Sequence, residues 1–234
     1  MKEIRVALVV FTVRAGRLEA LLVRRPGNVW TLPEATPASG QRLEEAAHRA
    51  LAEQTGVEGI ALEQLYTFDV PPERVTVAYL ALIAAGRHPL TPGPEAVEVR
   101  WFPVDDLPAL GADHARVLAY GHARLRAKTA YAPIAFQLLP ETFTLRELQA
   151  VYEAVLGAPL DTRNFRRDVL AAGVVEPVGR ARAGGPGRPP TLYRSVGGEF
   201  AVVARERRVA RAIAGGRTGA SGNGRTDGRP SHRS

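Results

Sequence analysis

Two short helices with matched start and stop signals stand in the second half of the sequence. Thr144, followed three residues later by Glu147, forms a capping-box pattern, and Gly157 is typical of the residue that ends a helix. After a turn of a few residues, Asp161 provides a second N-cap, and that helix pattern stops at Gly173. Two capped helices around so short a turn predict a helix-turn-helix.

A β-hairpin pattern follows this helix pair. Residues 174–178 and 191–196 are typical of strands, and residues 179–190 between them form a loop rich in Gly, Pro and Arg. The order helix, tight turn, helix, hairpin predicts a winged helix-turn-helix. We expect this DNA-binding domain to occupy residues 131–200, with residues 131–140 as an extended connector.

Residues 1–130 mix strand and helix signals and predict a separate α/β or α+β domain. Strong helix formers and apolar spacing predict two helices, and Gly56 follows the first as a stop. A stretch rich in Pro, Gly and Thr that contains Trp30 predicts a loop. The expected strands are residues 4–13, 18–23, 62–70, 75–83 and 97–103, the expected helices are residues 43–54 and 113–128, and the loop is residues 26–40.

Basic side chains are concentrated in the second half. Residues 1–130 carry 15 basic and 15 acidic side chains, whereas residues 131–234 carry 16 and 9, so the whole net charge of +7 lies there. Of the 31 basic residues, 29 are Arg, whose forked guanidinium suits phosphate oxygens and guanine edges. GC-rich codons also favour Arg over Lys, but they do not explain the asymmetry. The expected partner of the second half is double-stranded DNA.

Other classes of protein are disfavoured by what the sequence lacks. It has no Cys, which excludes disulfides, Cys-ligated zinc and a Cys nucleophile. No stretch approaches ~18 uncharged apolar residues, so we expect no transmembrane helix, and residues 1–13 resemble a strand more than a signal peptide. Residues 201–234 are expected to form a basic, largely disordered tail. The expected location is the cytoplasm, in association with the nucleoid.

The second helix of the pair is the expected recognition helix. Its apolar stripe is Phe165, Val169 and Ala172, and its polar side chains lie near the N-terminus, the end that enters a major groove in this motif. A solvated basic face is the alternative interpretation. In the wing, an Arg between Gly and Pro suits a narrow minor groove, and an ordinary flexible wing tip is the equal alternative. The expected DNA-binding residues are Thr144, Arg163, Asn164, Arg166, Arg167 and Arg188.

Residues 35–57 resemble a Nudix box, which reads Gly, five residues, Glu, seven residues, then Arg-Glu-apolar-x-Glu-Glu-x-Gly-apolar. Its Arg, first apolar residue, first Glu of the pair, Gly and last apolar residue match Arg49, Leu51, Glu53, Gly56 and Val57. Four positions depart: the motif Gly is Ala35, and three motif Glu are Gln41, Ala50 and Gln54.

These departures remove the carboxylates that metal-assisted hydrolysis needs. Positions 50, 53 and 54 are expected on one helix face, where a Nudix enzyme gathers carboxylates around Mg²⁺ to activate attack of water on a diphosphate. Only Glu53 keeps a charge there, and a methyl or an amide does not act as a general base. We therefore expect this domain to bind its ligand without hydrolysing it. No catalytic residue and no metal site are expected, and Glu53 is the single weak candidate for a metal ligand. A surface ion ladder with Arg49 is the plainer interpretation of Glu53.

The combined pattern resembles the Nudix-related transcriptional regulators of bacterial NAD metabolism. The similarity covers about residues 4–195 and is carried by segments at residues 65–68, 74–80, 101–107, 113–114, 131–136, 143–149 and 164–167. It implies a Nudix-like α/β/α sandwich followed by a winged helix. It further implies a homodimer that binds a palindromic operator and represses genes of NAD synthesis or salvage, or of pentose use. Binding of ADP-ribose, or of a similar nucleotide or sugar phosphate, is implied to release the DNA.

An effector pocket of this kind needs a stacking surface for a base and cations for phosphates. No cofactor is expected beyond such an effector. Adjacent Arg24 and Arg25 are expected on opposite strand faces, so at most one faces the pocket. For Tyr66 and Phe68, burial in the strand core is the equal alternative. The expected effector-binding residues are Arg24, Arg25, Trp30, Tyr66, Phe68 and Arg74.

Two other classes of function stay open at this point. One is a slow Mg²⁺-dependent Nudix-type pyrophosphatase acting on ADP-ribose, with an accessory DNA-binding domain, which Arg49 and Glu53 support. The other is a constitutive DNA-binding protein whose Nudix-like domain only dimerises. The function that the sequence favours is a ligand-responsive repressor.

Overall fold

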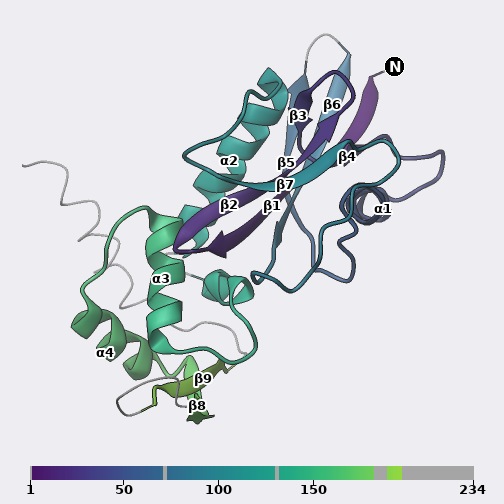
Figure 1. Ribbon diagram of the computed structural model, residues 1–234. Helices are drawn as coiled ribbons and strands as arrows, with labels where there is room; N and C mark the ends of the chain where they lie inside the picture. Colours follow the sequence, from purple (N-terminus) through teal and green to yellow (C-terminus); the bar gives the residue numbers. More distant parts are fainter. Residues whose placement is uncertain (1, 71–72, 130–131, 182–188, 197–234) are drawn as a thin grey trace, which may run out of the picture. The chain divides into compact units, whose positions relative to one another are not determined.

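The computed structural model describes residues 2–70, 73–129, 132–181 and 189–196. The chain has an α+β fold in which a mixed β-sheet with helices precedes a helix pair and a hairpin (Figure 1). The strands of the sheet follow the order β3-β2-β1-β6-β5, with β4 paired to β1 and β7 paired to β2. Their bounds are β1 Glu3–Arg14, β2 Arg17–Arg25, β3 Val29–Thr31, β4 Glu34–Ala35, β5 Glu63–Val70, β6 Arg74–Leu82 and β7 Glu98–Pro103.

The sheet is built around the parallel pair β1 and β6, which runs in register from Glu3 opposite Arg74 to Phe11 opposite Leu82. The remaining strand pairs are antiparallel. The short strands β3 and β4 lie inside residues 26–40, where the sequence predicted only loop. That prediction was wrong because strands of two or three residues form only when β2 and β1 supply the hydrogen-bond partners, and a local pattern does not report this pairing.

Two helices cover the sheet from opposite sides, α1 (Leu43–Thr55) and α2 (Ala112–Thr129) (Figure 1). Side chains of β1 alternate between these sides, as a strand requires. Leu8 and Val10 pack in the core beneath α1, whereas Val9 and Phe11 pack in the core beneath α2. A layer of helix on each face therefore buries both surfaces of β1 and gives the α/β/α sandwich.

Helix α2 approaches the sheet very closely at Gly121. A Cβ atom at this position would lie 2.8 Å from Cγ1 of Val9. Val117, Leu118 and Leu125 of the same helix are buried against the sheet. Because Gly121 has no side chain, the backbone of α2 contacts the Val9 side chain directly, and α2 packs closely on β1.

Residues 133–138 do not form the extended connector that the sequence predicted for residues 131–140. They form a 3-10 helix, η1 (Pro133–Leu138), in which Ile134 and Leu138 are buried in the same core as α2. Proline is tolerated in the first turn of a helix, where its missing N–H has no helical partner to lose. The prediction failed because burial of the apolar side chains, and not local propensity, decides the conformation here.

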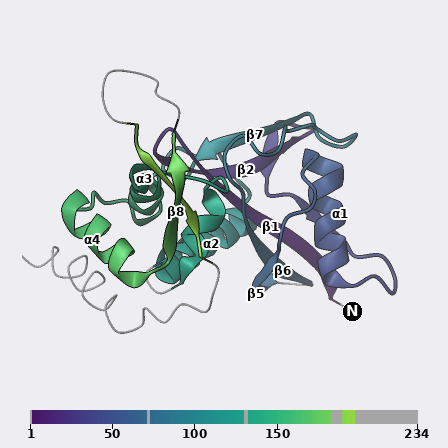
Figure 2. The same cartoon turned by 90° about the horizontal axis from the view of Figure 1, so that it is seen from below.

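The winged helix consists of α3 (Leu145–Leu156), α4 (Thr162–Ala172), β8 (Val175–Arg180) and β9 (Thr191–Ser195) (Figure 2). The predicted caps are confirmed. The hydroxyl of Thr144 accepts a hydrogen bond from the Glu147 amide at 3.2 Å, and the Asp161 carboxylate accepts one from the Asn164 amide at 2.8 Å. Gly157 and Gly173 end the two helices with left-handed backbone, at φ of 68° and 67°.

The hairpin is attached to the helix pair through Phe143. Phe143 and Tyr193 exchange two backbone hydrogen bonds, of 2.9 and 2.7 Å. The expected tail at residues 201–234 lies outside the described residues. Within the described part of the chain, no helix is long and apolar enough to cross a membrane.

Candidate functional site

The end of α1 is joined to β4 by the side chain of Gln54, one of the departures from the Nudix box. Its Nε2 donates to the Glu34 carbonyl at 2.6 Å, and its Oε1 accepts from the Glu34 amide at 3.3 Å. Only 8% of Gln54 is exposed. The amide thus pairs with one backbone residue as a neighbouring strand would, and its polar atoms are occupied in this structural role.

The other box positions are equally unsuited to a metal. Ala50 is fully buried and offers a methyl group, whereas the Glu53 side chain is 58% exposed and pairs with Arg49 at 3.3 Å. Within the regular helix these positions are neighbours, as predicted, but their burial differs: Ala50 and Gln54 are buried, whereas Glu53 is exposed to solvent. Gln41 accepts a hydrogen bond from Arg49 at 3.1 Å.

Mg²⁺ is bound in proteins mainly by carboxylate oxygens. In the part of the chain that the structure describes, no group of three or more His, Cys, Asp or Glu side chains could hold a metal ion. The residues at the box positions therefore do not fit the divalent cation of a Nudix enzyme.

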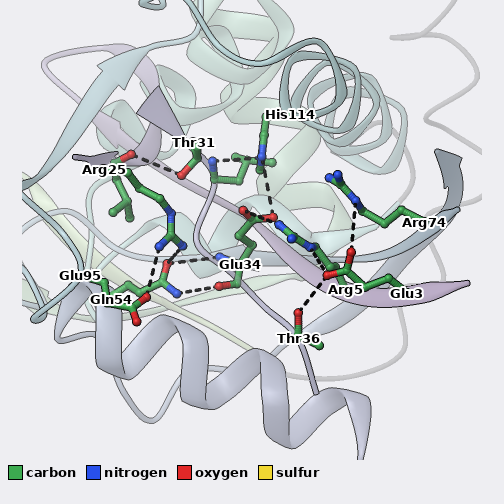
Figure 3. Close-up of polar contacts among 12 residues, drawn as sticks. Glu3, Arg5, Arg25, Thr31, Glu34, Thr36, Gln54, Arg74, Glu95 and His114 are labelled. Carbon is green, nitrogen blue, oxygen red and sulfur yellow. Dashed lines mark hydrogen bonds and ion pairs between the residues drawn. The ribbon is translucent and has the colours of Figure 1, made fainter. Parts of the chain in front are cut away.

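A polar network lies next to Gln54 and reaches across to α2 (Figure 3). The Leu32 amide donates to Nδ1 of His114 at 3.3 Å, and Nε2 of His114 lies 3.8 Å from the Glu34 carboxylate. Arg5 contacts the other oxygen of Glu34 at 3.3 Å. The segment around residues 32–34 is thus held by α1 on one side and by α2 on the other.

Burial favours the neutral form of His114. Burial lowers its pKa below the ordinary range, and the nearby carboxylates of Glu34 and Asp113 only partly offset this effect. A neutral ring is also required by geometry, because Nδ1 accepts the Leu32 N–H and therefore carries no proton itself. The remaining proton lies on Nε2, the atom that faces Glu34.

Arg24 and Arg25 lie on opposite faces of β2, as expected from strand alternation. The Arg24 guanidinium carbon lies 5.8 Å from the Trp30 ring centroid, and its Nη2 lies 2.8 Å from Glu98. Trp30 also packs edge-on against Phe102, with ring centroids 4.7 Å apart. Arg24 and half-buried Trp30 therefore form one cationic and aromatic corner on the α2 side.

The other four candidate effector residues do not join this corner. Arg25 contacts Gln54 at 3.3 Å on the α1 side, and Arg74 lies 4.0 Å from Glu3 near the start of β1 (Figure 3). Tyr66 and Phe68 belong to β5, at the opposite end of the strand order from β3. Their rings contact Tyr120 of α2, at centroid distances of 5.0 and 5.5 Å.

Glu34 and His114 are the residues that sequence reasoning missed. They are 80 positions apart, so no spacing rule links them, and the only signal was that residues 113–114 belong to a family-like segment. Their position beside Trp30 and Gln54 makes them part of the candidate site.

The candidate nucleic-acid interface is the exposed face of α4. The side chains of Arg163 and Arg166 are exposed and have no hydrogen-bond or ion-pair partner among the described residues. Arg167 is also exposed and contacts Asp168 at 2.9 Å. On the other face, Phe165 packs against Tyr152 of α3, with ring centroids 5.4 Å apart. The helix is thus anchored by its apolar side and presents its arginines outward.

The turn before α4 is braced by side chains from α3. Gln149 Nε2 lies 3.1 Å from the Leu160 carbonyl and 3.1 Å from the Thr162 hydroxyl. Glu153 accepts a hydrogen bond from the Leu160 amide at 2.8 Å. This brace, which sequence reasoning also missed, sets the position of the N-terminus of α4.

The last two candidate DNA-binding residues differ from those on α4. The Thr144 hydroxyl is engaged in the cap of α3, since it also donates to the Glu147 carboxylate at 2.9 Å. Arg188 lies outside the described residues. Arg180, at the end of β8, is exposed where the wing begins.

Two family models match the chain. Residues 2–120 match the model described as NUDIX domain, and residues 135–195 match the model described as NrtR DNA-binding winged helix domain. A curated relative, the ADPR responsive transcriptional repressor NtrR of Acinetobacter baylyi, is 34% identical over 204 residues, which cover 81% of this chain and 80% of the relative.

Solved structures agree with these matches. NrtR of Shewanella oneidensis in complex with a 27mer DNA has a TM-score of 0.69 and 32% identity, and the match covers 82% of this chain and 93% of that one. A MutT/nudix family protein of Enterococcus faecalis has a TM-score of 0.70 and 26% identity, covering 84% of this chain and 87% of its own. The similarity extends over both the sheet and the winged helix.

Proposed function

The chain belongs to the NrtR family of transcriptional regulators, which join a Nudix domain to a DNA-binding winged helix, and from this premise we propose that it is a repressor which ADP-ribose releases from DNA. It is a ligand-responsive DNA-binding regulator. Two observations carry the proposal: Gln54, at a metal-ligand position of the Nudix box, is bonded to the Glu34 backbone, and the arginines of α4 face outward. The first domain therefore binds ADP-ribose without hydrolysing it, and the second domain binds DNA.

We propose that α4 reads bases in the major groove of DNA. Arg163, Arg166 and Arg167 suit guanine edges and phosphates, and Asn164 suits adenine. Thr144 positions α3 through its cap, and Arg188 of the wing is proposed for the minor groove. Because a palindromic operator has two half-sites, the binding unit is a homodimer. The proposed targets are genes of NAD synthesis or salvage, and the proposed location is the cytoplasm.

We propose that the effector site is the corner formed by Trp30 and Arg24. The indole offers a surface on which an adenine can stack, and Arg24 offers a cation for the diphosphate. Arg25 faces Gln54 on the α1 side and Arg74 lies by Glu3, so we place neither of them in the proposed site. Tyr66 and Phe68 lie on β5, at the opposite end of the strand order from β3, and are not part of the proposed site.

The test of this function is DNA binding to the promoter region upstream of the protein's own gene neighbourhood, at fixed salt, with and without ADP-ribose. A coupling of ~1–3 kcal/mol would weaken DNA binding by about 5- to 150-fold. DNA binding that is indifferent to ADP-ribose, with no small-molecule thermal shift, would support a constitutive DNA-binding protein instead. Release of AMP from ADP-ribose with Mg²⁺, abolished by Glu53→Gln, would support the pyrophosphatase alternative.

The effector site is tested by replacing each of the two tryptophans by leucine. Trp30→Leu removes the stacking surface, which is worth about 1–3 kcal/mol per base, so the Kd for ADP-ribose should rise about tenfold. Trp101→Leu is the matched control, because Trp101 is partly buried and packs against the core on the α1 side. Isothermal titration calorimetry measures both. Equal losses in the two variants, or no loss at Trp30, would place the effector elsewhere.

A further inference from the structure

Helix α2 has one end at the candidate effector site and the other at the winged helix. It spans Ala112–Thr129, which at 1.5 Å per residue is a rod of about 27 Å. His114 lies in its first turn and Arg126 in its last. Each of these residues contacts a different functional part of the chain.

At the first end, α2 is bonded to the segment that carries the proposed effector site. His114 accepts the Leu32 N–H at 3.3 Å and faces the Glu34 carboxylate. Trp30, two residues before Leu32, forms a bridge with Leu110 just ahead of the helix. A ligand that shifts residues 30–34 must therefore either move the start of α2 or break these contacts.

At the other end, α2 is bonded to the end of α3. The Arg126 guanidinium donates to the Leu156 carbonyl at 2.9 Å. Leu156 is the last residue of α3, and Gly157 turns the chain toward α4. Carbonyls in the last turn of a helix lack helical partners and carry partial negative charge, so a guanidinium is well matched to them.

Between these ends the helix is fixed to the sheet along its length. Arg116 donates to the Asp69 carbonyl at 3.1 Å, and Lys128 pairs with Glu63, so both ends are also tied to β5. At the centre, Gly121 rests on Val9. Contacts along its whole length make the helix one rigid element, so a displacement or a strain at its first turn is transmitted to its last turn.

We propose that α2 couples effector binding to DNA binding, and that the Arg126–Leu156 hydrogen bond is the contact through which it acts on the winged helix. The proposal rests on the proposed function, because it names the element that connects the two sites. Arg126 is a positioning residue in this scheme. It touches neither DNA nor effector, but sets where the end of α3, and hence the turn before α4, lies.

The test compares Arg126→Met with Arg124→Met. Both variants remove one Arg from the same helix and keep an unbranched side chain. Arg124 is exposed and has no hydrogen bond or ion pair within the described part of the chain, which makes it the matched control. The measured quantity is the ratio of the Kd for DNA with saturating ADP-ribose to the Kd without it.

We expect Arg126→Met to reduce this ratio at least fivefold, while the Kd for ADP-ribose in the absence of DNA stays within twofold of wild type. Arg124→Met should leave the ratio within twofold, and Arg126→Lys, which keeps a donor, should restore part of it. A wild-type ratio of one would overturn the proposed function itself. A large wild-type ratio that Arg126→Met leaves unchanged, or that both variants reduce equally, would overturn only the role of α2.

Hydrogen exchange supplies a second readout that a purely structural role would not move. In the wild type without DNA, ADP-ribose should change the exchange of amides near the end of α3, around residues 155–157. In Arg126→Met this response should be lost although ADP-ribose still binds. An undiminished response in the variant would contradict the proposal.

Discussion

Replacing Arg166 and Arg167 by alanine should weaken operator binding by at least about 30-fold. Both side chains project from the exposed face of α4, and Arg167 must exchange its contact with Asp168 for DNA. A bidentate Arg contact with a base is worth about 1–3 kcal/mol, so two contacts together are worth about 2–6 kcal/mol. Fluorescence anisotropy with a labelled operator fragment measures the loss.

The control is a second double variant, which removes two arginines that lie outside α4. Arg87 and Arg124 are exposed and, among the described residues, have no side-chain partner. Replacing both by alanine should change operator affinity by less than about threefold, the scale of a long-range charge effect at moderate salt. A comparable loss in both double variants would mean that net charge, and not α4, binds the DNA. ADP-ribose affinity should stay unchanged in both.

The elements that could be predicted from the sequence are those whose conformation is determined by residues close together in the chain. The caps at Thr144 and Asp161 and the stops at Gly157 and Gly173 depend on hydrogen bonds and backbone angles within a few residues, so the winged helix was predicted nearly to its ends. Strands β3 and β4 and the helix η1 depend on distant partners. Their sequences resemble a loop and a connector until the sheet and core are assembled.

The candidate site divides in the same way. The loss of carboxylates from the Nudix box follows from residue types alone, and so does the basic face of α4. That Gln54 bonds to Glu34, that His114 accepts the Leu32 N–H, and that Trp30 and Tyr66 lie at opposite ends of the strand order all follow from tertiary pairing. A sequence pattern identifies which residues could act, but the sheet decides which of them meet.

The strongest consequence of this arrangement concerns Gln54→Glu, which restores a motif residue yet should destabilise the protein. The Glu34 carbonyl lies 2.6 Å from Nε2, so a carboxylate oxygen there would face an acceptor without a proton between them. Losing this hydrogen bond in a buried site costs about 1–3 kcal/mol, although Arg25 can still contact the new charge. Thermal unfolding followed by circular dichroism should show a lower Tm, by about 2–4 °C per kcal/mol.

Gln41→Glu makes the same chemical change at another box position and is expected to behave differently. Gln41 uses its Oε1 as an acceptor, from the Ala38 amide at 3.0 Å and from Arg49 at 3.1 Å. A carboxylate accepts both hydrogen bonds and adds a charge opposite Arg49, so the Tm should stay the same or rise slightly. Because Gln54 is needed as an amide, restoring Glu at positions 41, 50 and 54 together should give a less stable protein that releases no AMP from ADP-ribose with Mg²⁺. Turnover by that triple variant would show that the box can still support catalysis, and a Gln54→Glu protein as stable as wild type would contradict the structural role of the Gln54 amide.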